Sequence, residues 1–311
     1  MLNIFVNSLA SFSENKEKPF FNDLRNNVFS VLLSQGEKHN VNLFLSNTKK
    51  YDQQKKELKK AWIFKNNKWE TVYSQKVDLM YYHAKNEPSY EICSKINLDV
   101  INRPEFELLC DDKLKCYNSF PEITPKSFLI NNHDDLSKAL KFIETEKVVL
   151  KPRFGSYGNG VIIINKKDLR NGITKNTILQ EFIDSSNGLS SMGIKQTHDL
   201  RVVVINGRVD HCYARIPKNN SLISNVTRGA SKVYFSPSEI YSKIKLLLKK
   251  IDKSVSDFYP RIYSADFMMD NNKNCWLVEM NSKPGTLYYN DEPKIRERYY
   301  FNIVKAIANS V

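Results

Sequence analysis

The stretch SADFMMDNNKNCWLVEMN (residues 264–281) constrains the fold more than any other part of this chain of 311 residues. Its centre, DNNKN (270–274), consists of residues that favour tight turns, and a largely apolar run lies on each side. We therefore predict an antiparallel hairpin from about Tyr263 to Met280. Strands this apolar do not suit full exposure to water, so we expect the hairpin to be part of a larger, partly buried sheet.

The register of this hairpin brings two carboxylates together. If the turn is symmetric about Asn272 and Lys273, outward counting places Asp266 directly opposite Glu279. Asn281 shares the face of Glu279, because side chains alternate between the two faces of a strand. Like charges that face each other across two strands are unfavourable unless another group compensates for them.

A hard divalent cation is a group that would compensate for this pair. Mg²⁺ prefers a few oxygen ligands from the protein, together with nucleotide phosphates and water. We therefore predict that Asp266, Glu279 and Asn281 form a metal site. The alternative is a solvated pair of carboxylates at the surface, which suits two such apolar strands less well.

The segment KPRFGSYGNGV (151–161) holds three of the chain's 10 glycines, Gly155, Gly158 and Gly160. The apolar runs on both sides predict a strand–loop–strand unit, and glycine lets backbone N–H groups approach an anion closely. With Lys151 at its base, such a loop suits the phosphates of a nucleotide. Because no helix follows, the loop is neither a Walker A loop nor a dinucleotide-binding fingerprint. A glycine-rich turn without a ligand explains the segment, taken alone, equally well.

Three further segments carry polar residues that suit a nucleotide site. TILQEFID (177–184) is a predicted strand whose end could contact an adenine edge. DLRVVV places Asp199 and Arg201 on one face of another strand. The segment ARIPKNNSLISNVTRGA adds Arg215, Asn225 and Arg228, and arginine forks suit phosphates and carboxylates. Taken singly, these features also fit an ordinary strand end, a weak surface ion pair and solvated arginines.

The first part of the chain alternates strands and helices, which indicates an α/β sheet with parallel strands. The predicted strands are Leu2–Asn7, Val41–Ser46, Asp78–Ala84 and Leu98–Asn102. The predicted helices are Phe20–Gln35 with Gly36 as its C-terminal cap, the lysine-rich Lys49–Trp62, and Tyr90–Lys95.

A predicted helix over Glu105–Tyr117 and two prolines, Pro121 and Pro125, mark a boundary. Beyond them, strands with short connections predict an antiparallel, β-rich region. Further helices are expected over Asp134–Glu144, Ser236–Lys253, which starts with a capping box, and Lys294–Asn309. We expect three units, an α/β domain over 1–105 and two antiparallel-sheet subdomains over 106–188 and 189–311.

The net charge of +13 suits nucleotides, acidic peptides, nucleic acid or an anionic membrane. Solvated lysines explain the charge at least as well, and no nucleic-acid-binding motif accompanies them. No stretch approaches the ~18 consecutive apolar residues of a membrane span, and the first residues do not resemble a signal peptide. The five cysteines show no Cys-x-x-Cys spacing, so we expect reduced thiols in a cytoplasmic protein, without a disulfide framework or a zinc site.

The order of LKPRFGSYGNGV, LQEFI, DLRVVVINGRV, ARIPKNNSLISNVTRGA and ADFMM…WLVEMNSKPG resembles the ATP-grasp superfamily. The similarity is greatest to the RimK-like branch, the ribosomal-protein-modifying glutamate ligases, and extends from about Asp111 to Gly285. Three positions depart from that branch. Ile223 stands where an arginine is usual, and Ala230 replaces a glycine. Lys283 replaces a small residue and is closer to the spore-coat-associated ATP-grasp proteins.

The resemblance implies a fold and a role for each candidate residue. The fold would be an ATP-grasp fold with an N-terminal α/β pre-domain. Metal ligands would be Asp266, Glu279 and Asn281, and catalytic residues around the phosphoryl group would be Arg201, Arg215, Asn225 and Arg228. Nucleotide contacts would come from Lys113, Lys151, Gly155, Ser156, Tyr157, Gly158, Gly160, Gln180, Glu181, Phe182, Ile183 and Asp199.

The activity implied is an ADP-forming carboxylate–amine ligase that uses ATP and Mg²⁺ or Mn²⁺, with two ions expected. Its substrates would be an amino acid and a peptide, a protein or a small metabolite. A nucleotide-binding structural or coat-associated protein with little ligase activity, and a basic nucleic-acid-binding protein, are the competing classes. We expect no specific nucleic-acid partner and no membrane span. Both a monomer and a homo-oligomer are compatible with the sequence.

Overall fold

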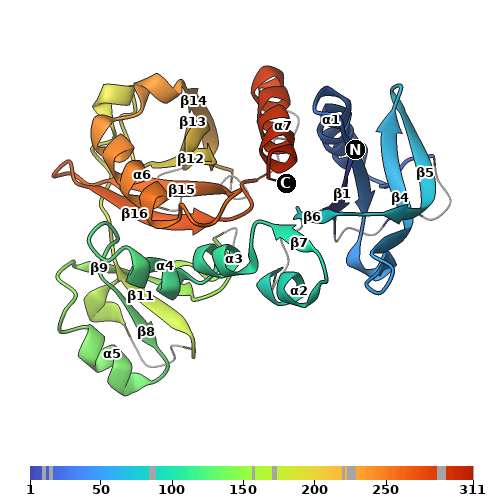
Figure 1. The fold of residues 1–311 in the computed structure, drawn as a ribbon. Coiled ribbons are helices and arrows are strands. Elements are labelled where there is room, and N and C mark those ends of the chain that lie inside the picture. The colour runs from blue at the N-terminus through green and yellow to red at the C-terminus, as the bar shows by residue number, and fades with distance from the viewer. Residues whose placement is uncertain are drawn as a thin grey trace.

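The computed structural model describes residues 1–8, 12–13, 17–83, 89–155, 158–169, 174–218, 221–222, 229–285 and 292–310. Its strands form separate N-terminal, middle and C-terminal sheets (Figure 1). No helix in these ranges is long and apolar enough to cross a membrane. All five cysteines lie in the described ranges and are free thiols, four of them buried.

The N-terminal sheet contains the four parallel strands that the sequence predicts, together with antiparallel strands that it does not. Its strand order is β3-β4-β2-β1-β6-β7, and β5 pairs with β4. The central strand β1 runs parallel to both β2 and β6, and β6 runs parallel to β7. The elements are β1 (Leu2–Asn7), α1 (Asp23–Lys38), β2 (Val41–Ser46), β3 (Tyr51–Asp52), β4 (Glu57–Lys65), β5 (Lys68–Lys76), β6 (Leu79–Tyr82), α2 (Ser89–Lys95) and β7 (Asp99–Ile101).

The predicted helix over Lys49–Trp62 is wrong. After a short 3-10 turn, Thr48–Lys50, this segment forms β3 and most of β4, which pairs antiparallel with β5. Asn66 and Asn67, both with positive φ, form the two-residue turn between β4 and β5. Burial of Leu58 and Trp62 in this sheet outweighs the helical propensity of the lysines.

Gly36 lies inside α1 and does not cap its end. A side chain at this position would come within 2.8 Å of the Val41 carbonyl oxygen, so the glycine permits a close approach of helix and strand. The predicted helix over Glu105–Tyr117 is divided into α3 (Pro104–Asp111) and α4 (Lys113–Ser119). Asp112 separates them because its carboxylate caps the N-terminus of α4.

The middle sheet, with strand order β10-β9-β11-β8, is antiparallel throughout, as the sequence predicts. Its elements are β8 (Ser127–Ile130), α5 (His133–Ala139), β9 (Lys147–Pro152), β10 (Ile162–Asn165) and β11 (Thr177–Glu181). The glycine segment connects β9 to β10. In Figure 1 this sheet and α5 extend away from the other two sheets.

The C-terminal sheet is also antiparallel, with strand order β14-β13-β12-β15-β16. Its elements are β12 (Asp199–Ile205), β13 (Arg208–Ile216), β14 (Ser231–Phe235), α6 (Ser242–Ser254), β15 (Ile262–Met269), β16 (Cys275–Asn281) and α7 (Pro293–Ala308). The predicted capping box at Ser236 is present but begins a 3-10 turn, and α6 starts only at Ser242. Helix α7 packs between α1 and this sheet, in a core shared with the N-terminal sheet (Figure 1).

The hairpin of β15 and β16 confirms that Asp266 lies opposite Glu279. The turn itself differs from the prediction, because Asp270 and Asn274 close it and Met269 pairs with Cys275. A bulge between Asp266 and Phe267 then shifts the register by one residue. The two departures cancel, so the predicted pairing of Asp266 with Glu279 is correct.

Candidate active site

One face of the C-terminal sheet collects charged residues from four neighbouring strands. Asp199 on β12 lies opposite Arg215 on β13, and Arg201 on β12 lies opposite Asp266 on β15. Asp266 in turn faces Glu279 on β16. Because directly paired residues in a sheet share a face, these side chains form one contiguous row.

Asp266 is the centre of a buried ion network. Its Oδ1 accepts a hydrogen bond from Arg201 Nε at 2.7 Å, and its Oδ2 accepts from Arg201 Nη2 at 2.6 Å. Arg215 Nη2 adds a third bond to the same Oδ2, at 2.7 Å. Burial alone would raise the pKa of Asp266, but the charges of Arg201 and Arg215 outweigh it and lower the pKa to about 2. The carboxylate is therefore ionised at neutral pH.

Arg215 links Asp266 to Asp199. Its Nε and Nη2 donate to the two carboxylate oxygens of Asp199 at 2.6 and 2.7 Å, a bidentate fork. Burial raises the pKa of Asp199 to about 6, although Arg215 holds both of its oxygens. Asp199 and Arg201, predicted on one face of a strand, thus bond to different partners in a larger network that orients each arginine.

Glu279 has a different counter-ion. Lys113, at the start of α4, places its Nζ 3.6 Å from Glu279 Oε1 and donates to the Gly155 carbonyl oxygen at 2.7 Å. The positive charges beside Asp266 and Glu279 therefore come from arginine and lysine side chains that are distant in sequence. Repulsion between the two carboxylates does not by itself require a metal ion.

The donor set still fits a hard cation. A carboxylate has about four lone-pair sites, and the arginines use three of those on Asp266. Glu279 keeps 26% of its side chain exposed, and Asn281 follows it on the same face. Within the described ranges no group of three or more His, Cys, Asp or Glu side chains could hold a metal. Two carboxylates and an amide oxygen on this face remain the best candidate.

Lys151 is a buried cation at the base of the glycine segment. Its Nζ donates to Gln180 Oε1 at 2.8 Å and lies 4.8 Å from the centre of the Tyr117 ring. Burial, together with the nearby charge of Lys113, lowers the pKa of Lys151 to about 7. A buried lysine whose hydrogen-bond partner is a neutral amide is well suited to bind an anion.

The glycine segment has the backbone that the sequence suggests. Gly155, Gly158 and Gly160 all have positive φ, at 125°, 69° and 71°. A side chain on Gly160 would also approach Pro152 within 2.8 Å. Ser156 and Tyr157 lie outside the described residues, as do Asn225 and Arg228.

Residues Gln180 to Ile183 lie at the end of β11, where Gln180 and Glu181 pair with Val149 and Val148 of β9. Gln180 contacts Lys151 directly, whereas the Glu181 carboxylate accepts the Glu144 backbone N–H at 3.0 Å. Lys147 Nζ lies 5.7 Å from the centre of the Phe182 ring. Strand β11 ends at Glu181, so the backbone of the next two residues is outside the sheet.

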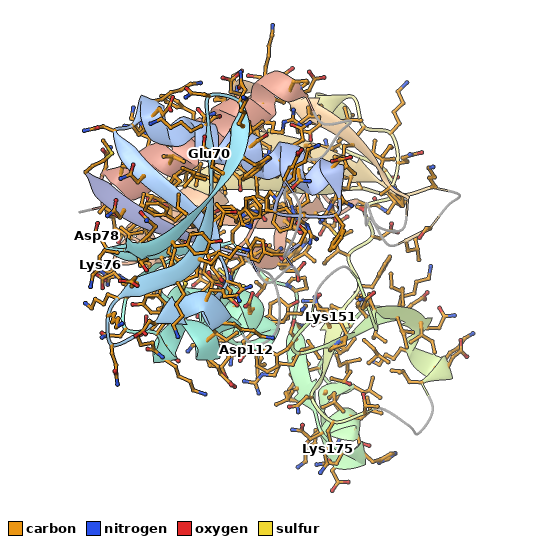
Figure 2. All side chains as sticks on the ribbon, turned by 90° about the vertical axis from the view of Figure 1, so that its right-hand side faces the viewer. Glu70, Lys76, Asp78, Asp112, Lys151 and Lys175 are labelled. Atoms are coloured by element: carbon orange, nitrogen blue, oxygen red, sulfur yellow. The ribbon has the colours of Figure 1, made fainter. Side chains whose placement is uncertain are left out.

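Sequence reasoning missed the ion pair that positions Lys113. Arg153 forms a bidentate fork with Asp112, with Nε to Oδ1 at 2.8 Å and Nη2 to Oδ2 at 2.6 Å. The Arg153 carbonyl also accepts the Lys113 backbone N–H at 3.2 Å. Figure 2 shows Asp112 and Lys151 where the middle sheet joins the rest of the molecule. The helix-capping pattern at Asp112 was the available signal.

Comparison with known proteins identifies the family of this chain. The family model described as the RimK-like ATP-grasp domain matches residues 110–307, more than half of the chain. The chain belongs to the RimK-like ATP-grasp family. The matched region of this RimK-like protein begins at α3 and ends within α7, so it contains the complete charged face and the glycine segment.

Curated relatives of this RimK-like chain include proteins named as ligases. Coenzyme gamma-F420-2:alpha-L-glutamate ligase of Methanocaldococcus jannaschii is 28% identical over 59% of this chain and 62% of that protein. Glutamate–LysW ligase ArgX of Sulfolobus acidocaldarius is 27% identical over 62% of this chain and 67% of that protein. The match to the first spans less than two thirds of its length.

The fold similarity covers nearly all of the RimK-like chain. D-alanyl-alanine synthetase A from Vibrio cholerae superimposes with a TM-score of 0.62 and covers 99% of this chain and 98% of its own. At 14% sequence identity this likeness shows the fold alone. The expected ATP-grasp architecture, with an α/β domain before the antiparallel sheets, is confirmed.

Proposed function

We propose that the protein is an ADP-forming ligase that joins a carboxylate to an amine through an acyl phosphate. The observation that carries this proposal is the charged face of the C-terminal sheet, where Asp266 faces Glu279 and Lys113 connects Glu279 to the glycine segment. The names of its relatives support an amino acid as one substrate, joined to a peptide, a protein or a small metabolite.

The chain's own cations would bind the nucleotide. Lys113 and Lys151 lie at the base of the glycine segment and would contact the phosphates, which the loop with Gly155, Gly158 and Gly160 would cover. The residues at the end of β11, Gln180 to Ile183, would line the adenine. Positive φ at the three glycines supports this role, because it allows backbone N–H groups to turn toward an anion.

Asp266, Glu279 and Asn281 would hold Mg²⁺ or Mn²⁺, and we propose two ions. When bound, such ions neutralise charge on the phosphates during phosphoryl transfer. Arg201 and Arg215 would stay anchored on their carboxylates and present their remaining N–H groups to the transferred phosphoryl group. Each guanidinium has five N–H donors, and the network uses two of Arg201 and three of Arg215.

The reaction has two steps. A substrate carboxylate oxygen bonds to the γ-phosphorus of ATP, and the bond to the bridging oxygen breaks, which releases ADP. The amine nitrogen then attacks the acyl carbon, loses a proton to solvent and expels phosphate. Fixed arginine and lysine donors stabilise the charge that develops, because they need no reorganisation during the reaction. A covering loop would protect the acyl phosphate from water.

We also propose the three units expected from the sequence, 1–105, 106–188 and 189–311. The separate N-terminal, middle and C-terminal sheets support this division. The packing of α7 against α1 would then join the third unit to the first.

The test is coupling between ATP use and amide formation. The purified protein is incubated with ATP, Mg²⁺ and pooled amino acids plus peptide acceptors, while ADP and product mass are followed together. We expect ADP to appear only with both substrates, in equal amount to a product whose mass is the sum of the two minus water. A protein that binds Mg-ATP but releases no ADP with any substrate pair would contradict the proposal.

A further inference from the structure

Two buried side chains outside the charged face hold the end of the hairpin that carries it. Asn102, just after β7, donates from Nδ2 to the carbonyl oxygens of Ile262 and Ser282, both at 2.7 Å. Its Oδ1 accepts the Ile262 backbone N–H, also at 2.7 Å. One amide side chain therefore links the first residue of β15 to the residue that follows β16.

The position of Asn102 is defined by the hydrogen-bond ladder. The last pair between β15 and β16 is Ser264 with Asn281. Beyond this pair the Asn102 amide makes hydrogen bonds to both segments. Asn102 is only 2% exposed, so water does not compete for these bonds.

Glu107 of α3 also contacts the residues that follow β16. Its Oε2 accepts the Ser282 hydroxyl at 2.9 Å and forms an ion pair with Lys283. The Glu107 side chain is fully buried, and the Lys283 side chain is 7% exposed. Lys283 Nζ also lies 4.8 Å from the centre of the Tyr82 ring on β6, so the contact reaches the N-terminal sheet.

A buried ion pair of this kind is a poor source of net stability. Removing two charges from water costs about as much as their attraction returns, and apolar replacements of similar size are often neutral or stabilising. What the pair does provide is a unique position for the backbone it holds. Here that backbone, Ser282 and Lys283, follows directly after Asn281, and Glu279 lies two residues before Asn281.

We propose that Asn102 and Glu107 are positioning residues that fix Asn281 opposite Ser264 and Glu279 opposite Asp266. Lys283 is the partner through which Glu107 acts. This inference rests on the proposed function, because it assigns the two residues to the metal-binding strand. They belong to the segment that joins the N-terminal sheet to the rest of the chain, so this segment would set the geometry of the metal site.

The decisive variant is the double replacement Glu107→Leu with Lys283→Met. Because both charges leave together, we expect thermal stability close to that of the wild type. We expect the Mg²⁺ concentration that gives half of the ATP-dependent thermal stabilisation to rise about tenfold, as when outer partners of metal ligands are lost. The matched control is Lys38→Met with Glu297→Leu, an exposed pair at 2.9 Å, which should change neither value.

Two outcomes would overturn the inference. One is a folded double variant whose Mg²⁺ requirement equals that of the wild type. If the double variant does not fold, Ser282→Ala decides, because it removes only the hydroxyl bond to Glu107. An unchanged Mg²⁺ requirement in Ser282→Ala then overturns the inference, and a raised requirement supports it.

The Asp266→Asn variant separates this inference from the proposed function. If Mg-ATP still stabilises Asp266→Asn, the proposed metal site itself is wrong. If Asp266→Asn loses the stabilisation while the double variant responds to Mg²⁺ as the wild type does, only the positioning role fails.

Discussion

The cations of the candidate site fall into two regions that differ in how their charge is balanced. On the C-terminal sheet, Arg201 and Arg215 form forks with Asp266 and Asp199, so two positive and two negative groups neutralise one another. At the glycine segment, Lys151 bonds to a neutral amide, and Lys113 lies 3.6 Å from Glu279. The arginines are held in place before any ligand arrives, whereas the lysine region retains the capacity to bind an anion.

The largest expected difference between the two regions is in stability. Arg215→Met should lower the free energy of unfolding by about 3–5 kcal/mol, because it leaves two carboxylates buried with one arginine between them. Lys151→Met should leave stability unchanged or raise it, because it removes a buried charge whose partner is neutral. Urea denaturation measures both. Equal losses in the two variants would contradict the distinction.

A smaller expected difference concerns the protonation of Lys151. With a pKa of about 7, Lys151 is mostly neutral at pH 8 in the free protein, and nucleotide phosphates would raise that pKa. Nucleotide binding should therefore take up close to one proton at pH 8 and almost none at pH 6. Calorimetry in buffers of different ionisation enthalpy measures the number of protons taken up.

A matched variant controls the proton measurement. Lys175→Met removes an exposed lysine in the turn before β11 (Figure 2) and should leave proton uptake unchanged. Absence of uptake at pH 8 in the wild type would show that Lys151 already carries its charge before the nucleotide binds.

Local patterns were sufficient to predict much of the fold. The strands β1, β2, β6 and β7, the strand–loop–strand unit around the glycines and the final helix all follow from apolar periodicity and turn residues. The helix prediction for Lys49–Trp62 failed because the lysines of this segment mask a strand pattern. Only pairing with β5 explains that pattern. The two asparagines between β4 and β5 were the signal that favoured a hairpin.

The site was predictable in part. The pairing of Asp266 with Glu279 could be counted from the turn, although a bulge that the count did not include restores the register. The contacts of Arg201, Arg215 and Lys113 could not be predicted in this way, because they depend on how separate strands and α4 come together. The same holds for Glu107 and Lys283, which are distant in sequence and meet only in the folded chain.

The central claim is that Asp266 and Glu279 hold the metal ion that accompanies ATP. The most direct measurement is thermal stabilisation by Mg-ATP of Asp266→Asn and Glu279→Gln, with Glu70→Gln on the exposed side of β5 as the control. The account predicts that both site variants lose the stabilisation and that the control keeps it. Full stabilisation of both site variants would contradict the claim.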